Sequence, residues 1–172
     1  AFTWSVRAAR TAAAYVPAWT RPALGGLVVG LLSLWSFGAL TFGEHQVADL
    51  ASPDVGVGFL AAALVSKLTA SAVCAATGWR GGFIIPLFFA GAACGLLLHE
   101  ALPSVDATML MAAAMVAACT GVTKTPLGST LVVTEMAGLR LLPTTTLAAV
   151  IAVVLTSEVH LIHSQRARTT TP

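Results

Sequence analysis

The residues with the clearest chemical meaning are 81–86, which read Gly-Gly-Phe-Ile-Ile-Pro. The glycine pair interrupts the apolar run before it. Pro86 stands where the first turn of a helix accepts proline, because the N–H that proline lacks would have no partner there. The spacing therefore predicts a helix that begins near residues 83–85, with outward-pointing N–H groups that can bind an anion at the positive end of the helix dipole. The predicted anion-binding residues are Gly82, Phe83, Ile84 and Ile85.

Apolar side chains around these N–H groups are compatible with a small halide. The partial charges of backbone dipoles bind such an anion without the trapping that a full Lys or Arg charge would cause. The same pattern also occurs at an ordinary break between two packed helices. Residues 81–86 alone therefore leave both interpretations open.

Two cations lie close to this segment in the sequence. Arg80 directly precedes the glycine pair and could raise the local concentration of anions, or it could anchor the chain at the membrane interface. Lys67 lies in the middle of an apolar run, where a charge facing lipid is costly. It could attract anions toward the site, or it could extend its ammonium to the interface or pair with an interior acid.

The composition indicates that lipid surrounds these residues. The chain has 172 residues, of which 57% are hydrophobic and 9% charged, and its mean hydropathy is +0.87. A soluble domain has roughly a quarter of its residues charged, so this chain has too few charges to cover an apolar core. The net charge of +2 gives no reason to expect a nucleic-acid partner. No nucleophile–base pair or metal-ligand spacing occurs in the apolar runs, so we expect neither an enzyme nor a cofactor.

The elements that would position the site are apolar runs punctuated by Gly and Pro. Several are shorter than the roughly 20 residues needed to cross a bilayer, which indicates broken or tilted helices that line a cavity or are buried in protein. Arginines flank both ends of the apolar region, so both ends are expected in the cytoplasm of a multi-pass inner-membrane protein. The expected helical runs are 23–42, 55–79, 83–98, 107–122, 126–139 and 144–162.

Three segments of the chain resemble the CLC family. This family contains chloride channels, some of them voltage-gated, and proton-coupled anion antiporters. The family has a Gly-Gly-x-Phe-x-Pro segment that opens a helix, similar to residues 81–86 here. Residues 113–136 resemble a helix, short turn and helix of the family, and residues 21–30 resemble the helix that opens its second half. Within residues 113–136 the matching positions are Pro126, Leu127, Glu135 and Met136.

The resemblance implies an all-α membrane fold, namely the second inverted repeat of a CLC-type transporter with short, broken and tilted helices. We expect a cytoplasmic linker over residues 1–22, a membrane region over 23–162 and a tail over 163–172. The serine and glutamate motifs of the family's first half are not found in this sequence. The chain is therefore expected to need the N-terminal half of the same protein for transport.

The implied partners are chloride or another small monovalent anion, protons in the case of an antiporter, the lipid bilayer and a second copy of the protein. The family's homodimer interface corresponds to the helices expected at 126–139 and 144–159. The residues expected at this interface are Leu131, Thr134, Leu147 and Ile151.

Two positions depart from the family pattern. Ile84 replaces the phenylalanine of the family motif, which changes the wall of the site but leaves its amides in place. Ile162, or alternatively His163, occupies the position of a family tyrosine that donates its hydroxyl to the anion, and the surrounding residues resemble the fluoride-transporting branch. The rival interpretation is one half of an unrelated inverted-repeat transporter that uses the break at 81–86 for a carboxylate substrate.

Overall fold

The described part of the computed structural model, residues 2–36, 39, 46–52, 55–79 and 81–159, is helical, with short turns between the helices. A helix is present within each expected run, and the last of these helices ends at Leu155. The short helix α3 lies between the first two expected runs. Arg80, Ile162, His163 and the tail at 163–172 lie outside the described residues. The elements in chain order are α1 (Phe2–Ala14), α2 (Arg21–Trp35), α3 (Gln46–Leu50), α4 (Val57–Thr77), α5 (Ile84–Ala101), α6 (Ala107–Thr123), α7 (Pro126–Ala137), the 3-10 helix η2 (Leu139–Leu141) and α8 (Leu142–Leu155).

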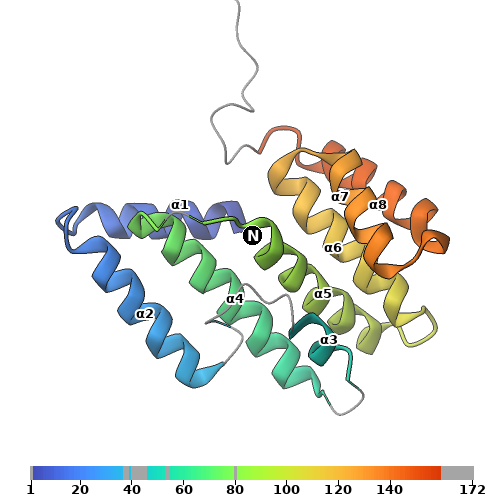
Figure 1. Cartoon of the computed structure of the whole chain (residues 1–172), viewed down its shortest axis with the longest axis horizontal. Helices are drawn as coiled ribbons and strands as arrows, with labels where there is room; N and C mark the ends of the chain where they lie inside the picture. The colour runs from blue at the N-terminus through green and yellow to red at the C-terminus, as the bar shows by residue number, and fades with distance from the viewer. Residues whose placement is uncertain (1, 37–38, 40–45, 53–54, 80, 160–172) are drawn as a thin grey trace, which may run out of the picture.

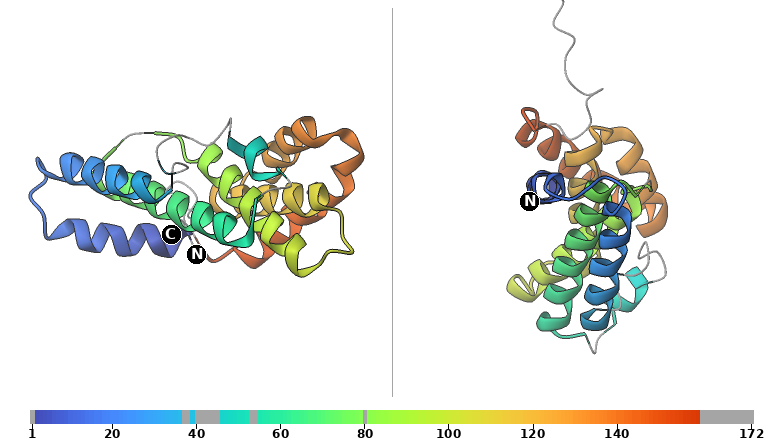
Figure 2. Two further views of the ribbon diagram at one scale, coloured as in Figure 1. Left: turned by 90° about the horizontal axis from the view of Figure 1, so that it is seen from below. Right: turned by 90° about the vertical axis from the view of Figure 1, so that its left-hand side faces the viewer.

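The long helices α2, α4, α5 and α6 lie side by side in that order, and α7 and α8 pack beyond α6 (Figure 1). α1 runs across one end of α4, as the views in Figure 2 also show. From α4 to α8, helices that follow one another in the sequence are also neighbours in space, which is typical of helices joined by short turns.

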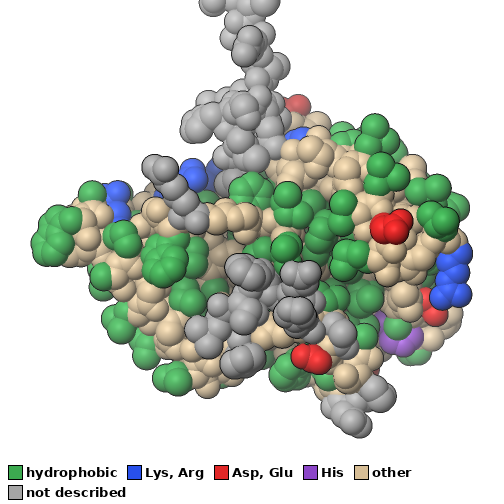
Figure 3. Space-filling model, viewed as in Figure 1, with side chains coloured by type: hydrophobic (Ala, Val, Ile, Leu, Met, Phe, Trp, Pro, Cys, Tyr) green, Lys and Arg blue, Asp and Glu red, His purple; other side chains and the backbone are tan. Residues whose placement is uncertain are grey.

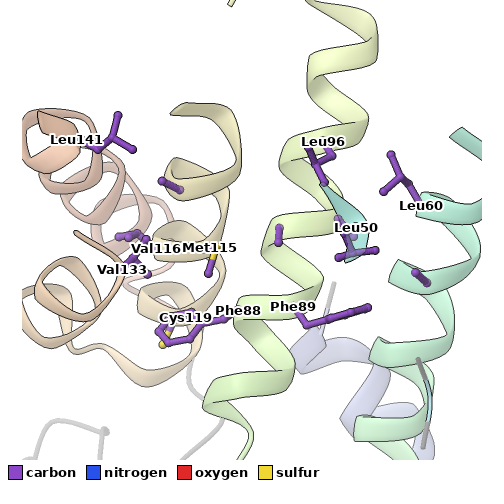
Figure 4. Packing of buried hydrophobic residues seen from close by; sticks show 14 of the residues in the cluster. Leu50, Leu60, Phe88, Phe89, Leu96, Met115, Val116, Cys119, Val133 and Leu141 are labelled. Carbon is purple, nitrogen blue, oxygen red and sulfur yellow. The ribbon is translucent and has the colours of Figure 1, made fainter. Parts of the chain in front are cut away.

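α5 is the central element and has little polar surface, as expected for a helix that is apolar on all sides. Its two phenylalanines point in opposite directions: Phe88 lies toward Cys119 of α6, and Phe89 lies on the side of α4 (Figure 4). Both rings are buried, with 6% of Phe88 and 1% of Phe89 exposed. The main core of the chain is thus built on both sides of this one helix.

α5 and α6 are in backbone contact at two glycines. A Cβ atom added at Gly91 would lie 2.5 Å from the Cα of Met115, and one added at Gly95 would lie 2.5 Å from the Cα of Met111. Glycines four residues apart share one helix face, and in membranes such Gly-x-x-x-Gly faces let two helix backbones approach closely. The pair is antiparallel, since the later glycine meets the earlier methionine.

The start of α2 is attached to the end of α4. The indole N–H of Trp79 donates a hydrogen bond of 2.9 Å to the carbonyl of Pro22. Gly25 faces Thr77, and a Cβ added to this glycine would lie 2.2 Å from the threonine hydroxyl. These contacts place residue 79, two positions before the predicted anion-binding segment, against the first turn of α2.

α2 is shorter than the expected run of 23–42, because its helix ends at Trp35. Ser36 has extended backbone dihedrals and accepts a hydrogen bond of 3.0 Å from the hydroxyl of Ser66 on α4. Hydropathy continues past this point and therefore does not reveal the end. The difference is one of backbone geometry rather than of polarity.

Two of the described helices, α4 and α5, are long and apolar enough to cross a membrane, and α2, α6 and the 139–155 segment are apolar but shorter. Many large hydrophobic side chains are also exposed, and Figure 3 shows hydrophobic side chains spread over one face of the molecule. A soluble monomer rarely exposes apolar area on this scale, so the surface fits lipid or further protein.

Candidate anion-binding site

The helix start predicted from the glycines and proline is present. Phe83 is the residue before α5, Ile84 is its first residue, and the first intrahelical bond runs from the Leu87 N–H to the Phe83 carbonyl at 3.1 Å. Helix geometry leaves the N–H groups of Phe83, Ile84 and Ile85 without partners inside α5, and Pro86 has none. Three donors therefore meet at the positive end of an 18-residue helix.

The glycine pair that precedes the start of α5 is not covered by other described parts of the chain. Gly81 and Gly82 are exposed, and a Cβ added at either would meet no atom within 4 Å. Ile84 and Ile85 are 48% and 37% exposed. Phe83 is half-buried and packs against the small cluster that contains Leu87, so it holds the helix start on the protein while its neighbours face outward.

Lys67 is buried beside the second turn of α5. Its side chain is 1% exposed, and its Nζ lies 4.6 Å from the centroid of the Phe89 ring, within the range of a cation–π contact. The alternative that this lysine extends its ammonium to an interface is therefore wrong for the chain as folded here. The Cα atom of Phe89 lies about 7.5 Å further along the axis of α5 than that of Ile84, at 1.5 Å rise per residue.

The residues expected at the dimer interface separate into two groups. Leu131, Leu147 and Ile151 are 65%, 60% and 48% exposed and lie on α7 and α8. Thr134 is 1% exposed, and its hydroxyl lies 2.8 Å from the hydroxyl of Thr145. The expectation for Thr134 is therefore corrected: this side chain joins α7 to α8 inside the chain and does not belong to an exposed face.

The sequence profile of the family described as "Voltage gated chloride channel" matches residues 1–157. This chain belongs to the CLC family. The resemblance of the three sequence segments is thereby confirmed over most of the chain, and a CLC domain of membrane helices agrees with the two membrane-length helices α4 and α5.

Relatives of this chain include the "Putative ion-transport protein YfeO" of Escherichia coli O1:K1 and of Escherichia coli O45:K1, each 35% identical over 143 residues. The same protein of Escherichia coli O17:K52:H18 is 34% identical over 143 residues. Each alignment covers 77% of this chain but only 31% of the relative, so the CLC chain described here spans about a third of the length of these relatives. No solved structure matches the chain.

Two features of this CLC chain escaped prediction from the sequence. The spacing Gly91-x-x-x-Gly95 is a recognisable sign of close helix contact, but it does not reveal that the partner is α6. Lys124 lies in the turn after α6 and donates hydrogen bonds to the backbone carbonyl and the hydroxyl of Thr156. No local signal predicts a contact between residues 32 positions apart.

Proposed function

We propose that this chain is the second half of a CLC-type transporter for a small monovalent anion such as chloride, and that backbone amides at the start of α5 hold the anion. The observation that carries the proposal is the open helix start at residues 83–85, in a chain whose residues 1–157 match the family. The amides of Phe83, Ile84 and Ile85 are the donors, with Gly82 allowing close approach of the anion. The transporter works as a channel or as a proton–anion antiporter.

We expect the N-terminal half of the same protein to supply the serine and glutamate motifs of the family, since the chain spans only about a third of the length of the relatives. In this proposal the chain is an inverted repeat in a multi-pass inner-membrane protein. The shorter apolar helices, such as the 17-residue α6, are tilted or broken elements that the other half covers. The exposed Gly81 and Gly82 would then face the other repeat across the anion path.

Lys67 is proposed to add positive potential to the anion path from inside the protein. Its side chain is buried, so a positive charge there is screened by solvent less than a surface charge would be. Arg80 is proposed to raise the local anion concentration. Ile162, or alternatively His163, is proposed to stand beside the anion at the position of the family tyrosine, and all three residues lie outside the described part of the chain. For the homodimer, the proposed surface is the exposed apolar face at Leu131, Leu147 and Ile151.

The direct test removes one amide at the helix start without changing its side chain. An amide-to-ester replacement at Ile84 in the full-length protein substitutes an oxygen for the N–H. A hydrogen bond to a charged group is worth about 1.5–3 kcal/mol, so we expect chloride affinity to fall by about tenfold to a hundredfold. The matched control is the same replacement at Thr108, the second residue of α6, which should leave affinity unchanged.

Flux from vesicles that contain the full-length protein identifies the anion. Release of chloride supports the proposal as stated, whereas release of fluoride alone would assign the protein to the fluoride-transporting branch. Release of neither anion, with uptake of a small carboxylate, would favour the unrelated inverted-repeat transporter. Unchanged chloride affinity after the ester replacement at Ile84 would remove the α5 amides from the site.

A further inference from the structure

Lys124 links the turn after α6 to the end of α8. This residue closes α6 in a left-handed backbone conformation, with φ of 59°, and its side chain is partly buried. Its ammonium donates hydrogen bonds to the backbone carbonyl and the hydroxyl of Thr156, the residue that follows the last turn of α8. A cation thus lies where the last carbonyls of α8 are directed.

The turn that carries Lys124 lies on the same side of the molecule as the start of α5. Val122, two residues earlier, packs in the cluster that contains Leu87 from the first turn of α5, together with the half-buried Phe83. Gly121 faces the side chain of Thr156, whose nearest atom would lie 3.5 Å from a Cβ added to this glycine. Figure 1 shows both helix ends at the upper side of the view. The last turn of α6 therefore stands between the start of α5 and the end of α8.

The two helix ends carry opposite partial charges. The start of α5 is positive and attracts an anion, while the end of α8 is negative and repels one. The buried cluster of Val122 and Leu87 lies between the two ends, so this repulsion is screened less than it would be in water alone. A full positive charge bonded to the end of α8 cancels the repulsion and leaves net positive potential on this side of the protein.

We propose that Lys124 increases the anion affinity of the α5 helix start by neutralising the negative end of α8. The inference rests on the proposed function, because it concerns the anion bound at the α5 amides. Lys124 acts as an electrostatic positioning residue: it need not touch the anion, and its contribution follows from its charge. A lysine with a purely structural role would instead contribute through its two hydrogen bonds to Thr156.

The test measures chloride affinity of the full-length protein by calorimetry, with sodium chloride titrated against a sodium gluconate background. Lys124→Arg keeps the charge, Lys124→Met removes it and Lys124→Glu reverses it. We expect affinity to stay within about twofold for the Arg variant, to fall about threefold to tenfold for the Met variant and to fall further for the Glu variant. Thr156→Val removes one acceptor while keeping the charge, so we expect affinity within about twofold of wild type.

Arg140→Met is the matched control, because this arginine is exposed in η2, beyond the opposite end of α7, and the substitution removes the same charge. It should leave chloride affinity unchanged. Equal losses of chloride affinity in the Arg, Met and Thr156→Val variants would overturn the inference and indicate a structural role. Unchanged chloride affinity in Lys124→Met would also overturn it. If Lys124→Glu does not fold, the Arg, Met and Thr156→Val variants still decide. Absence of chloride binding in the wild type would instead contradict the proposed function itself.

Discussion

Gly91 of α5 lies against the backbone of α6 so closely that a Cβ atom on this glycine would be 2.5 Å from the Cα of Met115. Real Cβ atoms do not approach backbone atoms to this distance, so any larger residue must push the two helices apart. Gly95 repeats the contact one turn later, against Met111. The close packing of α5 against α6 therefore requires glycine at both positions. The proposed anion site lies at the start of α5 in this helix pair.

Gly91→Ala is expected to destabilise the folded protein by about 1–3 kcal/mol, the usual cost of overpacking a tight contact. The identical change at Gly30 of α2, where a Cβ would meet no atom within 4 Å, should be neutral or slightly stabilising because alanine favours helix. Thermal denaturation of the two purified variants in detergent measures the difference. Equal melting temperatures for the two variants would contradict the close contact.

The buried hydroxyl pair between α7 and α8 predicts an asymmetry. The Thr145 hydroxyl also donates to the carbonyls of Leu141 and Leu142, each at 3.1 Å. The Thr134 hydroxyl is bonded to the Thr145 hydroxyl. Thr145→Val should therefore cost about 1–3 kcal/mol by leaving the Thr134 hydroxyl unpaired in the interior. Thr134→Val should cost less, since Thr145 keeps a carbonyl acceptor. Chemical denaturation of both variants tests the order, and a larger loss for Thr134→Val would contradict it.

The bond between Trp79 and the Pro22 carbonyl predicts that Trp79→Phe weakens the junction of α2 and α4. The expected loss is about 1 kcal/mol, the net value of one hydrogen bond, with most of the aromatic packing retained. Trp19→Phe is the control, because that indole is 84% exposed. Hydrogen exchange of the first turn of α2 reports the effect locally, and equal exchange in the two variants would exclude a role for the bond.

Chloride itself should stabilise the protein if the α5 amides bind it. A ligand that binds only the folded state adds about 2.7 kcal/mol at a concentration of 100 times its dissociation constant. Melting in sodium chloride should therefore occur at a higher temperature than in sodium gluconate at equal ionic strength. The ester replacement at Ile84 should reduce this shift, and an undiminished shift would place the bound chloride elsewhere.

The sequence predicts the part of the site that depends on backbone chemistry. Glycine and proline act locally, so the helix start at Ile84 follows from residues 81–86 without knowledge of the fold. The end of α2 was misplaced because residues 36–42 remain apolar while Ser36 turns the chain into an extended conformation. The polarity of a residue indicates whether it contacts water or an apolar environment, but it does not indicate the backbone conformation of that residue.

Long-range contacts lay beyond sequence reasoning for a different physical reason. Thr134 stands among small and apolar residues that suit either an internal or an external contact, and only the packing of α7 on α8 assigns it to the interior. Lys124 lies between a predicted helix and Pro126, a sequence context typical of a lysine in an exposed turn. Its contact with Thr156 exists because α6 and α8 end side by side, a property of tertiary packing alone.

The glycine contacts on α6 also fix how α5 is rotated about its own axis. Successive residues of a helix are about 100° apart, and only a face made of Gly91 and Gly95 fits against α6. A one-residue insertion between Pro86 and Gly91 would therefore keep every existing side chain and yet turn the amides of residues 83–85 by about 100° around the helix axis. In this chain the direction of the helix-start amides is thus set by the number of residues between Pro86 and Gly91, which is four, and not by the identity of any one of them.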